Sequence, residues 1–405
     1  MHTNKEENYT RESMFGRPPK DALSLLDNFD SILQEIKPLS SKHLQSLPYN
    51  IQQLSLQLTS ERSSRKKTYM NSRVEMISYT RYFMWWNLFR LTSLFARFPK
   101  DFFQNLLQTE EETYCLDIGS GPLTLPIALY LARPELRDKK LNWYCLDPSS
   151  TSLSLGEDIF LSIVAKLRGR AWNIIKVKGL FGETIRNKPK LICSANMFNE
   201  MYLEDRRPLE ELVKLYAKTL SQYTKDENAS VLLVEPGIPR SARFISLFRD
   251  SLLRQNFSIL SPCPHEEACP MPGTRDKKWC HFTMNAENAP EKLQKLSRDA
   301  SLAKEKIVLS YVFASKCPQK NKDDSALRIS SLPIRLPKQK IGHYACGKKG
   351  LMLFVKNKYT IAEDAALFSG DLVQQNKEKA ETKQGNLQKK RTQIDSKSGA
   401  IIIDS

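Results

Sequence analysis

The sequence lacks the apolar segments that direct a chain into or through a membrane. The first 21 residues contain no apolar signal core, and they carry acidic side chains, which transit peptides avoid. The most apolar run, residues 82–98, is interrupted by Asn87, Arg90 and Arg97, so we expect it to be too short and too charged to cross a bilayer. We therefore expect no membrane partner and a reducing compartment, the bacterial cytoplasm, with the mitochondrial matrix as the alternative.

Cysteine and acidic side chains are also scarce. Eight cysteines in 405 residues are too few for a secreted disulfide scaffold. Lys and Arg number 62 and Asp and Glu only 45, which leaves a formal net charge of +17. Such an excess is typical of proteins that bind polyanions, most often nucleic acid and less often an anionic membrane surface, although charge that only maintains solubility is the plain alternative. The length suggests two or three domains with a full α/β core.

The spacing of apolar residues divides the chain into five parts. In order, we predict a polar leader (1–20), a helical N-terminal region (21–110), a domain with a Cys-rich insertion at 260–285 (111–320), a small β appendage (321–357) and a disordered basic tail (358–405). Within 111–320, short apolar runs alternate with helical segments, which is the pattern of a parallel, doubly wound sheet. Seven strands are expected, the final two as an antiparallel pair, so the predicted fold class is α/β.

A glycine loop follows the first predicted strand, and an acid closes the second. Gly119 and Gly121 let the backbone turn tightly and approach a ligand, and the carboxyl edge of such a sheet is where ligands bind. Asp147 can accept hydrogen bonds from ribose hydroxyls, and Thr124 replaces the third glycine of the dinucleotide fingerprint. This pattern resembles class I S-adenosylmethionine (SAM) methyltransferases, with a turn needed only for strand–helix packing as the alternative. The predicted cofactor-binding residues are Asp117, Gly119, Ser120, Gly121 and Asp147.

The sequence contains fewer signals for the residues that would carry out methyl transfer. Asn196 and Glu200 follow the fourth predicted strand, but the Asn/Asp-Pro-Pro-aromatic run of many base-amine methyltransferases is missing. Cys193 is expected inside a strand, so it does not match the nucleophile of cytosine-C5 methylation. Asn196 is the candidate catalytic residue, because its side-chain carbonyl could orient a base amine. Glu200 is expected either to face a ligand or to complement the helix dipole.

Cysteines gather in the Pro-rich insertion. Cys263, Cys269 and Cys280 fall within eighteen residues, and Cys346 or Cys317 could supply a fourth thiolate. The spacing matches neither a zinc finger nor a zinc ribbon, whereas four thiolates with Cys-Pro steps suit an iron–sulfur cluster. Zinc held by three cysteines and a nearby histidine, or chance clustering without a metal, remain as alternatives.

Taken in order, these segments resemble one family. The segments are DIGSGP, LNWYCLDPSS, CSANMFNE, VEPGIPRSARFI, CPHEEACP, WCHF and GHYACGKKG. They are similar to the mitochondrial and bacterial small-ribosomal-subunit Rsm-type methyltransferase-like family, over residues 45–356. The resemblance implies a class I methyltransferase core, a SAM site at the residues given above, and a 4Fe–4S cluster on Cys263, Cys269, Cys280 and Cys346. Leu123 stands where the family usually has glycine, and the ten-residue gap before Cys280 is long.

The resemblance also implies association with the small ribosomal subunit and its rRNA, in assembly or translation, and no DNA partner. The predicted function is SAM-dependent methyl transfer, with rRNA as the expected substrate. The alternative is a non-catalytic rRNA-binding assembly factor whose cluster is structural or redox-sensing. Contacts with rRNA are expected at residues 62–67, at residues 275–278 and in the tail, where Lys and Arg are concentrated.

Overall fold

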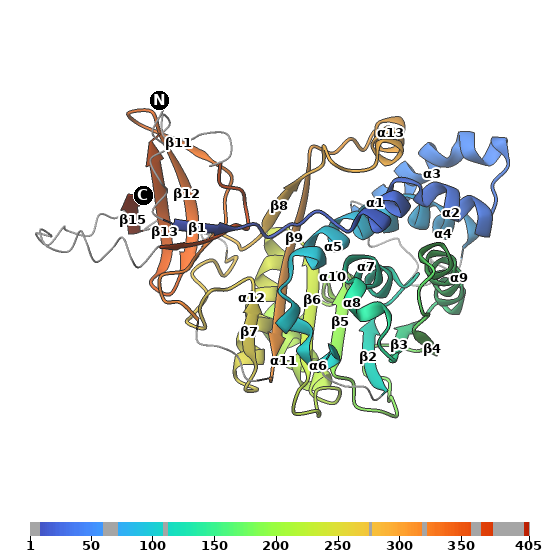
Figure 1. Cartoon of the computed structure of the whole chain (residues 1–405), viewed down its shortest axis with the longest axis horizontal. Helices are drawn as coiled ribbons and strands as arrows, with labels where there is room; N and C mark the ends of the chain where they lie inside the picture. Colours follow the sequence, from blue (N-terminus) through green and yellow to red (C-terminus); the bar gives the residue numbers. More distant parts are fainter. Residues whose placement is uncertain are drawn as a thin grey trace, which may run out of the picture. The chain divides into compact units, whose positions relative to one another are not determined.

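The computed structural model (Figure 1) describes residues 9–59, 72–107, 112–274, 278–317, 322–357, 366–375 and 401–404. The chain forms two compact units, each assembled from segments that are far apart in the sequence. The first unit contains Phe15–Glu235 and Met284–Ile307, and the second contains Met1–Met14, Pro236–Thr283 and Val308–Ser405. In the described part of the chain, no helix is both long and apolar enough to cross a membrane.

Helices open the first unit. They are α1 (Lys20–Asp27), α2 (Phe29–Ile36), α3 (Ser41–Thr59), α4 (Arg73–Ser78), the π-helical η3 (Tyr79–Met84), α5 (Trp85–Arg97), the 3₁₀ turn η4 (Lys100–Phe103) and α6 (Gln104–Leu107). Apolar residues at three- and four-residue spacing bring Leu26, Phe29 and Ile32 into the core. Helix α5, which comes from the most apolar run of the sequence, is buried on nearly every side, including at Arg90. That run therefore makes a core helix.

Five parallel strands follow in the same unit. They are β2 (Thr113–Ile118), β3 (Leu141–Asp147), β4 (Asn173–Lys178), β5 (Leu191–Ala195) and β6 (Ser230–Pro236), in the order β4-β3-β2-β5-β6. The connecting helices are α7 (Thr124–Ala132), α8 (Pro134–Arg137), α9 (Ser150–Leu167), α10 (Phe198–Glu204) and α11 (Leu209–Leu220). The chain leaves β2 toward β3 on one side and returns to β5 on the other. This switch point opens a crevice at the carboxyl ends of the strands.

The second unit holds the antiparallel strand pair expected at the end of the domain. Helix α12 (Pro239–Leu253) leads into β7 (Ser258–Ser261), which pairs antiparallel with β9 (Lys306–Ser315). The connection between them contains the Cys-rich segment, β8 (Phe282–Asn285) and α13 (Glu291–Asp299). Five parallel strands and this pair are the seven strands of the class I methyltransferase α/β fold that the sequence predicts.

A mixed sheet completes the second unit. Its strands are β1 (Tyr9–Glu12), β10 (Leu327–Ile329), β11 (Ile334–Leu336), β12 (Lys340–Gly347), β13 (Gly350–Asn357), β14 (Leu372–Gln375) and β15 (Ile401–Asp404), in the order β1-β14-β10-β12-β13-β15, with β11 paired to β12. Its core includes Ile329, Ala345, Phe354 and Val373. The appendage is therefore larger than residues 321–357.

Two sequence predictions are corrected by this sheet. Strand β1 lies inside the predicted polar leader and pairs with β14, and both β14 and β15 lie inside the predicted disordered tail. Four-residue strands carry too little local periodicity to be recognised with certainty, although the Ile run of β15 has the β-branched composition of a strand, and their order comes from pairing with distant strands. Residues 376–400 of the tail, the basic cluster at 62–67 and residues 275–277 lie outside the described residues. Lys278 is described, and its ammonium lies 4.0 Å from the centre of the Tyr344 ring.

Candidate functional site

The glycine loop after β2 turns at two left-handed glycines. Gly119 has φ +71° and Gly121 has φ +52°. A Cβ on Gly119 would lie 2.2 Å from Cγ of Met197, whereas a Cβ on Gly121 would meet nothing closer than Oγ of Ser152, at 3.9 Å. Position 119 therefore requires glycine for both conformation and space, and position 121 for conformation alone. The backbone N–H of Gly119 donates to the carbonyl of Leu146 at 2.8 Å, which fastens the loop to the end of β3.

Leu123, where the family usually has glycine, completes this loop. It has φ +58° and precedes the first residue of α7. A left-handed conformation costs a non-glycine residue about 1–2 kcal/mol. The Leu123 side chain is fully buried, and that burial offsets the strain. Leucine is thus accommodated at this left-handed position.

Asp147 connects the loop to the end of β3. Its Oδ2 accepts from the N–H of Gly121 at 2.9 Å, and its Oδ1 accepts from the N–H of Ser149 at 2.8 Å. Burial raises the pKa of Asp147, while these two backbone hydrogen bonds lower it. Each carboxylate oxygen keeps a further lone pair, so Asp147 can still accept from a ligand hydroxyl.

Asp117 and Ser120 lie beneath the loop. Both are almost fully buried, and Oδ2 of Asp117 accepts from Oγ of Ser120 at 2.6 Å. Burial raises the pKa of Asp117 to about 7. Among the described residues, neither belongs to the set that lines the adjacent cavity, which includes Gly119, Gly121 and Asp147. The structure thus places three of the five predicted residues at the cavity, and two where they shape the loop from below.

The cavity has a volume of about 660 Å³ and lies within the first unit. That size is within the usual range for small-molecule sites. Its walls come from the carboxyl ends of β2, β3, β4 and β5, from α10, α11 and the turn between them, and from η3. The lining residues are Tyr79, Ile118, Gly119, Gly121, Pro122, Leu146, Asp147, Pro148, Ser149, Gly179, Leu180, Phe181, Ala195, Asn196, Met197, Glu200, Met201, Asp205, Arg206, Arg207, Leu215 and Tyr216. Apolar surface with a few convergent carboxylates suits an organic ligand that carries positive charge.

Asn196 lines the cavity, and its side-chain oxygen already accepts one hydrogen bond. It has φ +58°, and its Oδ1 accepts from the guanidinium of Arg90 at 3.1 Å. The same guanidinium donates to Oδ1 of Asn87 at 2.9 Å. Because the Asn196 oxygen is engaged by a cation, the side chain is held in one orientation. Its oxygen keeps a second lone pair, so the orientation of a base amine by Asn196 stays a prediction.

A buried acid contacts the start of α10, the helix that contributes to the cavity wall. Glu235, at the end of β6, is fully buried, and its carboxylate accepts from the N–H groups of Phe198 (3.0 Å) and Asn199 (3.1 Å) at the start of α10. Burial raises the pKa of Glu235 to about 8, and Arg90 acts against that rise. Burial likewise lowers the pKa of Arg90 to about 10. Sequence reasoning missed these roles, although a charge inside an apolar run is the signal that could have shown them.

The predicted thiols of the Cys-rich segment all lie in the second unit. Burial raises the pKa of Cys280 well above its usual value, and the nearby thiols of Cys269, Cys263 and Cys346 raise it further. Nε2 of His265 lies 3.1 Å from Sγ of Cys346. Three of the four predicted ligands therefore act electrostatically on the fourth. Among the described residues, however, no group of three or more His, Cys, Asp and Glu side chains is arranged to hold a metal ion.

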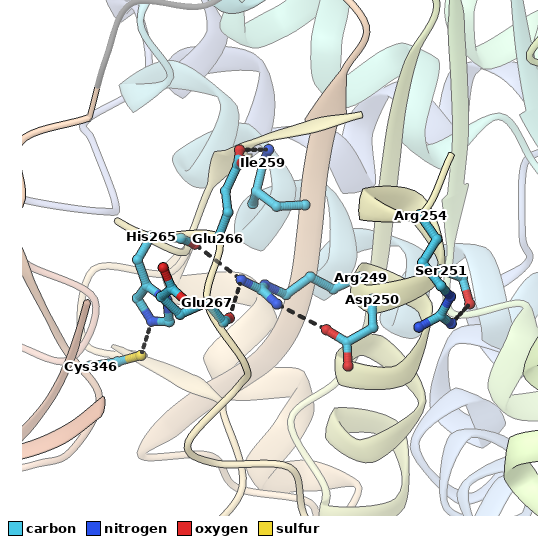
Figure 2. A network of polar contacts seen from close by, with 9 residues as sticks. All are labelled: Arg249, Asp250, Ser251, Arg254, Ile259, His265, Glu266, Glu267 and Cys346. Carbon is cyan, nitrogen blue, oxygen red and sulfur yellow. Dashed lines mark hydrogen bonds and ion pairs between the residues drawn. The ribbon is translucent and has the colours of Figure 1, made fainter. Parts of the chain in front are cut away.

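Arg249 organises the loop that carries these cysteines. Its guanidinium donates to the carbonyl oxygens of His265 (3.0 Å) and Glu267 (2.9 Å) and pairs with the Asp250 carboxylate at 2.9 Å, as Figure 2 shows. Burial lowers the pKa of Arg249, and the neighbouring Cys263 sulfur raises it. A buried cation beside several thiols favours their thiolate forms, the forms that bind metals. The remaining strand cysteines, Cys115, Cys145 and Cys193, are fully buried.

Comparison with known proteins gives one family. The family model described as mitochondrial small ribosomal subunit Rsm22 matches residues 104–355. No curated protein matches the chain.

Among solved structures, the chain is similar to several methyltransferases. A precorrin-6y C5,15-methyltransferase from Geobacter metallireducens is 12% identical, with 52% of this chain and 83% of that one covered and a TM-score of 0.29. The plantazolicin methyltransferase BpumL, in complex with S-adenosylhomocysteine (SAH), is 11% identical, with 70% and 98% covered and a TM-score of 0.29. The mitomycin 7-O-methyltransferase MmcR is 14% identical, with 60% and 70% covered and a TM-score of 0.34.

Proposed function

This chain belongs to the mitochondrial small ribosomal subunit Rsm22 family, and from that premise we propose that it is a SAM-binding methyltransferase-like protein acting at the small ribosomal subunit, on its rRNA. The observation that carries the proposal is the cavity at the carboxyl edge of the parallel sheet. There the second-strand acid, Asp147, is hydrogen-bonded to the glycine turn at Gly121. The family description also favours the mitochondrial matrix over the bacterial cytoplasm.

The residues around the cavity suit SAM in shape and charge. The turn at Gly119 and Gly121 brings the backbone close to the ligand without a Cβ, and Asp147 accepts from the ribose hydroxyls. A pyrophosphate cradle is unnecessary for SAM, which agrees with the missing third glycine. When bound, SAM supplies an electrophilic methyl group on a sulfonium, so the protein contributes mainly by positioning the acceptor.

Transfer of a labelled methyl group tests this function. Full-length protein is incubated with methyl-labelled SAM and small-subunit rRNA, as wild type, Asp147→Ala and the control Asp158→Ala, which changes an exposed acid on α9. We expect label in the RNA with wild type and control. We expect at least a tenfold loss with Asp147→Ala, because the variant loses both the ligand contact and the loop contact.

The opposite outcome supports the second candidate. Equal rRNA binding by all three proteins with no label transferred would contradict catalysis. It would leave a non-catalytic rRNA-binding assembly factor.

We also propose that Cys263, Cys269, Cys280 and Cys346 hold a 4Fe–4S cluster, with zinc as the alternative. The support is the chemistry of the donor set: four neighbouring thiols in one unit and a buried guanidinium that offsets negative charge. A cluster would cross-link segments that are far apart in the sequence, and it requires a reducing compartment.

A further inference from the structure

A π-helical stretch interrupts the helical segment that runs from α4 to α5. The stretch, η3, spans Tyr79–Met84 and is continuous with α4 before it and α5 after it. Such turns are rare, occur mostly as single turns inside α-helices, and are frequent at functional sites. The side chains of η3 are therefore candidates for a functional role.

The first residue of the π-helix contributes to the cavity, and a neighbouring aromatic residue in the same stretch does not. Tyr79 lines the cavity and forms a hydrogen bond with the side chain of Asn87. Tyr82 is fully buried, is absent from the lining set of the described residues, and its hydroxyl donates to the carbonyl of Leu302 at 3.2 Å. The two tyrosines, three positions apart, thus have different surroundings.

Carboxylates surround Tyr79 within the same cavity. Asp147, at the end of β3, and Glu200, in the first turn of α10, also line it. Burial raises the pKa of the Tyr79 hydroxyl, and the charges of Glu200 and Asp147 raise it further, so both carboxylates act on this side chain. Tyr79 therefore stays protonated, as an aromatic group beside two anions.

The charges of Glu200 and Asp147 act on Tyr79 more strongly than that of Arg90, which has the opposite effect. Arg207 pairs with Asp205 at 2.6 Å, and Arg206 is exposed. Arg90 is not among the described lining residues and lies behind the wall beside Asn196. An aromatic ring with neighbouring carboxylates attracts a cation that has no N–H to donate, because ring faces and anions need no hydrogen bond to do so.

We propose that Tyr79, together with Glu200, recognises the positive charge of the ligand and so distinguishes a sulfonium from the corresponding thioether. The consequence is that SAM binds more tightly than SAH, the product that remains after methyl transfer. This inference rests on the proposed SAM site. It makes the π-helical segment of the N-terminal region part of that site, and Tyr79 a specificity-determining residue.

Binding calorimetry on the full chain tests the inference without an RNA substrate. The ligands are SAM, its ammonium analogue sinefungin, and SAH. The proteins are wild type, Tyr79→Leu, Tyr79→Phe, Glu200→Gln and the matched control Tyr82→Phe, which removes only a hydroxyl outside the cavity. We expect wild type to bind SAM and sinefungin at least about fivefold more tightly than SAH, which is the size of a cation–π contribution of about 1 kcal/mol.

The variants separate recognition of charge from packing. Tyr79→Leu and Glu200→Gln are expected to lower the affinity for SAM and sinefungin about fivefold and to leave SAH nearly unchanged. Tyr79→Phe and Tyr82→Phe should preserve the preference. If Tyr79→Leu and Glu200→Gln weaken all three ligands equally, or if wild type binds SAM and SAH alike, the inference is wrong while the SAM site stands. If wild type binds none of the ligands, the proposed function fails with it.

Discussion

Four residues around the cavity hold left-handed backbone conformations: Gly119 at φ +71°, Gly121 at φ +52°, Leu123 at φ +58° and Asn196 at φ +58°. Non-glycine residues take such conformations where the surrounding structure imposes them, and these positions cluster at ligand sites. Gly119 and Leu123 belong to the loop after β2, and Asn196 follows β5. Both strand ends that flank the switch point thus carry a non-glycine residue in a left-handed conformation.

The two glycines of the loop provide a matched pair. We expect Gly121→Ala to lower the free energy of unfolding by about 1 kcal/mol, from the left-handed conformation alone. Gly119→Ala should cost about 2 kcal/mol or more, because its Cβ would also collide with Met197. Denaturant unfolding measures both. Equal losses for the two variants would show that Met197 moves aside freely.

Among the elements, regular periodicity was readable from the sequence and irregular features were not. The helices α1 and α2 and the buried strands β2, β3 and β6 follow apolar patterns that any chain must bury. The π-helix η3 has no such pattern, because one widened turn does not change the apolar character of its residues. Strands β1, β14 and β15 are short, and their pairing partners are far away in the sequence.

The end of α9 gives a prediction at this scale. Arg168 has φ +51°, its side chain is exposed, and Gly169 then donates to the carbonyl of Val164 at 3.1 Å. Glycine is the residue that helices prefer at such a left-handed cap. We expect Arg168→Gly to stabilise the protein by about 0.5–1 kcal/mol, after the larger unfolded-state entropy of glycine is subtracted.

The neighbouring position is the control. A Cβ on Gly169 would lie 2.2 Å from the hydroxyl oxygen of Tyr130, which donates to the carbonyl of Arg170. Gly169→Ala should therefore destabilise by about 1–3 kcal/mol. Thermal melting compares the two variants, and a fall in melting temperature for Arg168→Gly would contradict the cap argument.

At the scale of the whole molecule, the two candidate sites belong to different units. Every residue that lines the cavity comes from the first unit, and the four grouped cysteines and Arg249 come from the second. The formal net charge of +17 belongs to the chain as a whole, and it supports an rRNA partner without assigning a surface to it. We therefore expect the ligand site and the metal site to be separable by mutation.

Metal analysis of protein prepared without oxygen tests this separation. We expect about four iron and four sulfide per chain in wild type. The variant Cys346→Ser should lose them and still bind SAM. The matched control is Cys317→Ser, which alters a buried cysteine outside the group and should retain both. Stoichiometric zinc without iron would replace the cluster by the zinc alternative, and metal-free wild type would contradict both.

By itself, the sequence determined the α/β class and the glycine turn with its second-strand acid, whereas the cluster on the insertion cysteines and Cys346 stays a prediction. Local periodicity indicates the α/β class, and the glycines and the acid are residue types with few other roles at these positions. Only the tertiary structure decided that Asp117 and Ser120 support the loop from below, that Arg90 engages the Asn196 oxygen, and that Tyr79 reaches the cavity. Such roles depend on which distant side chains meet in space, because burial and hydrogen-bond partners are properties of the folded chain and not of any segment alone.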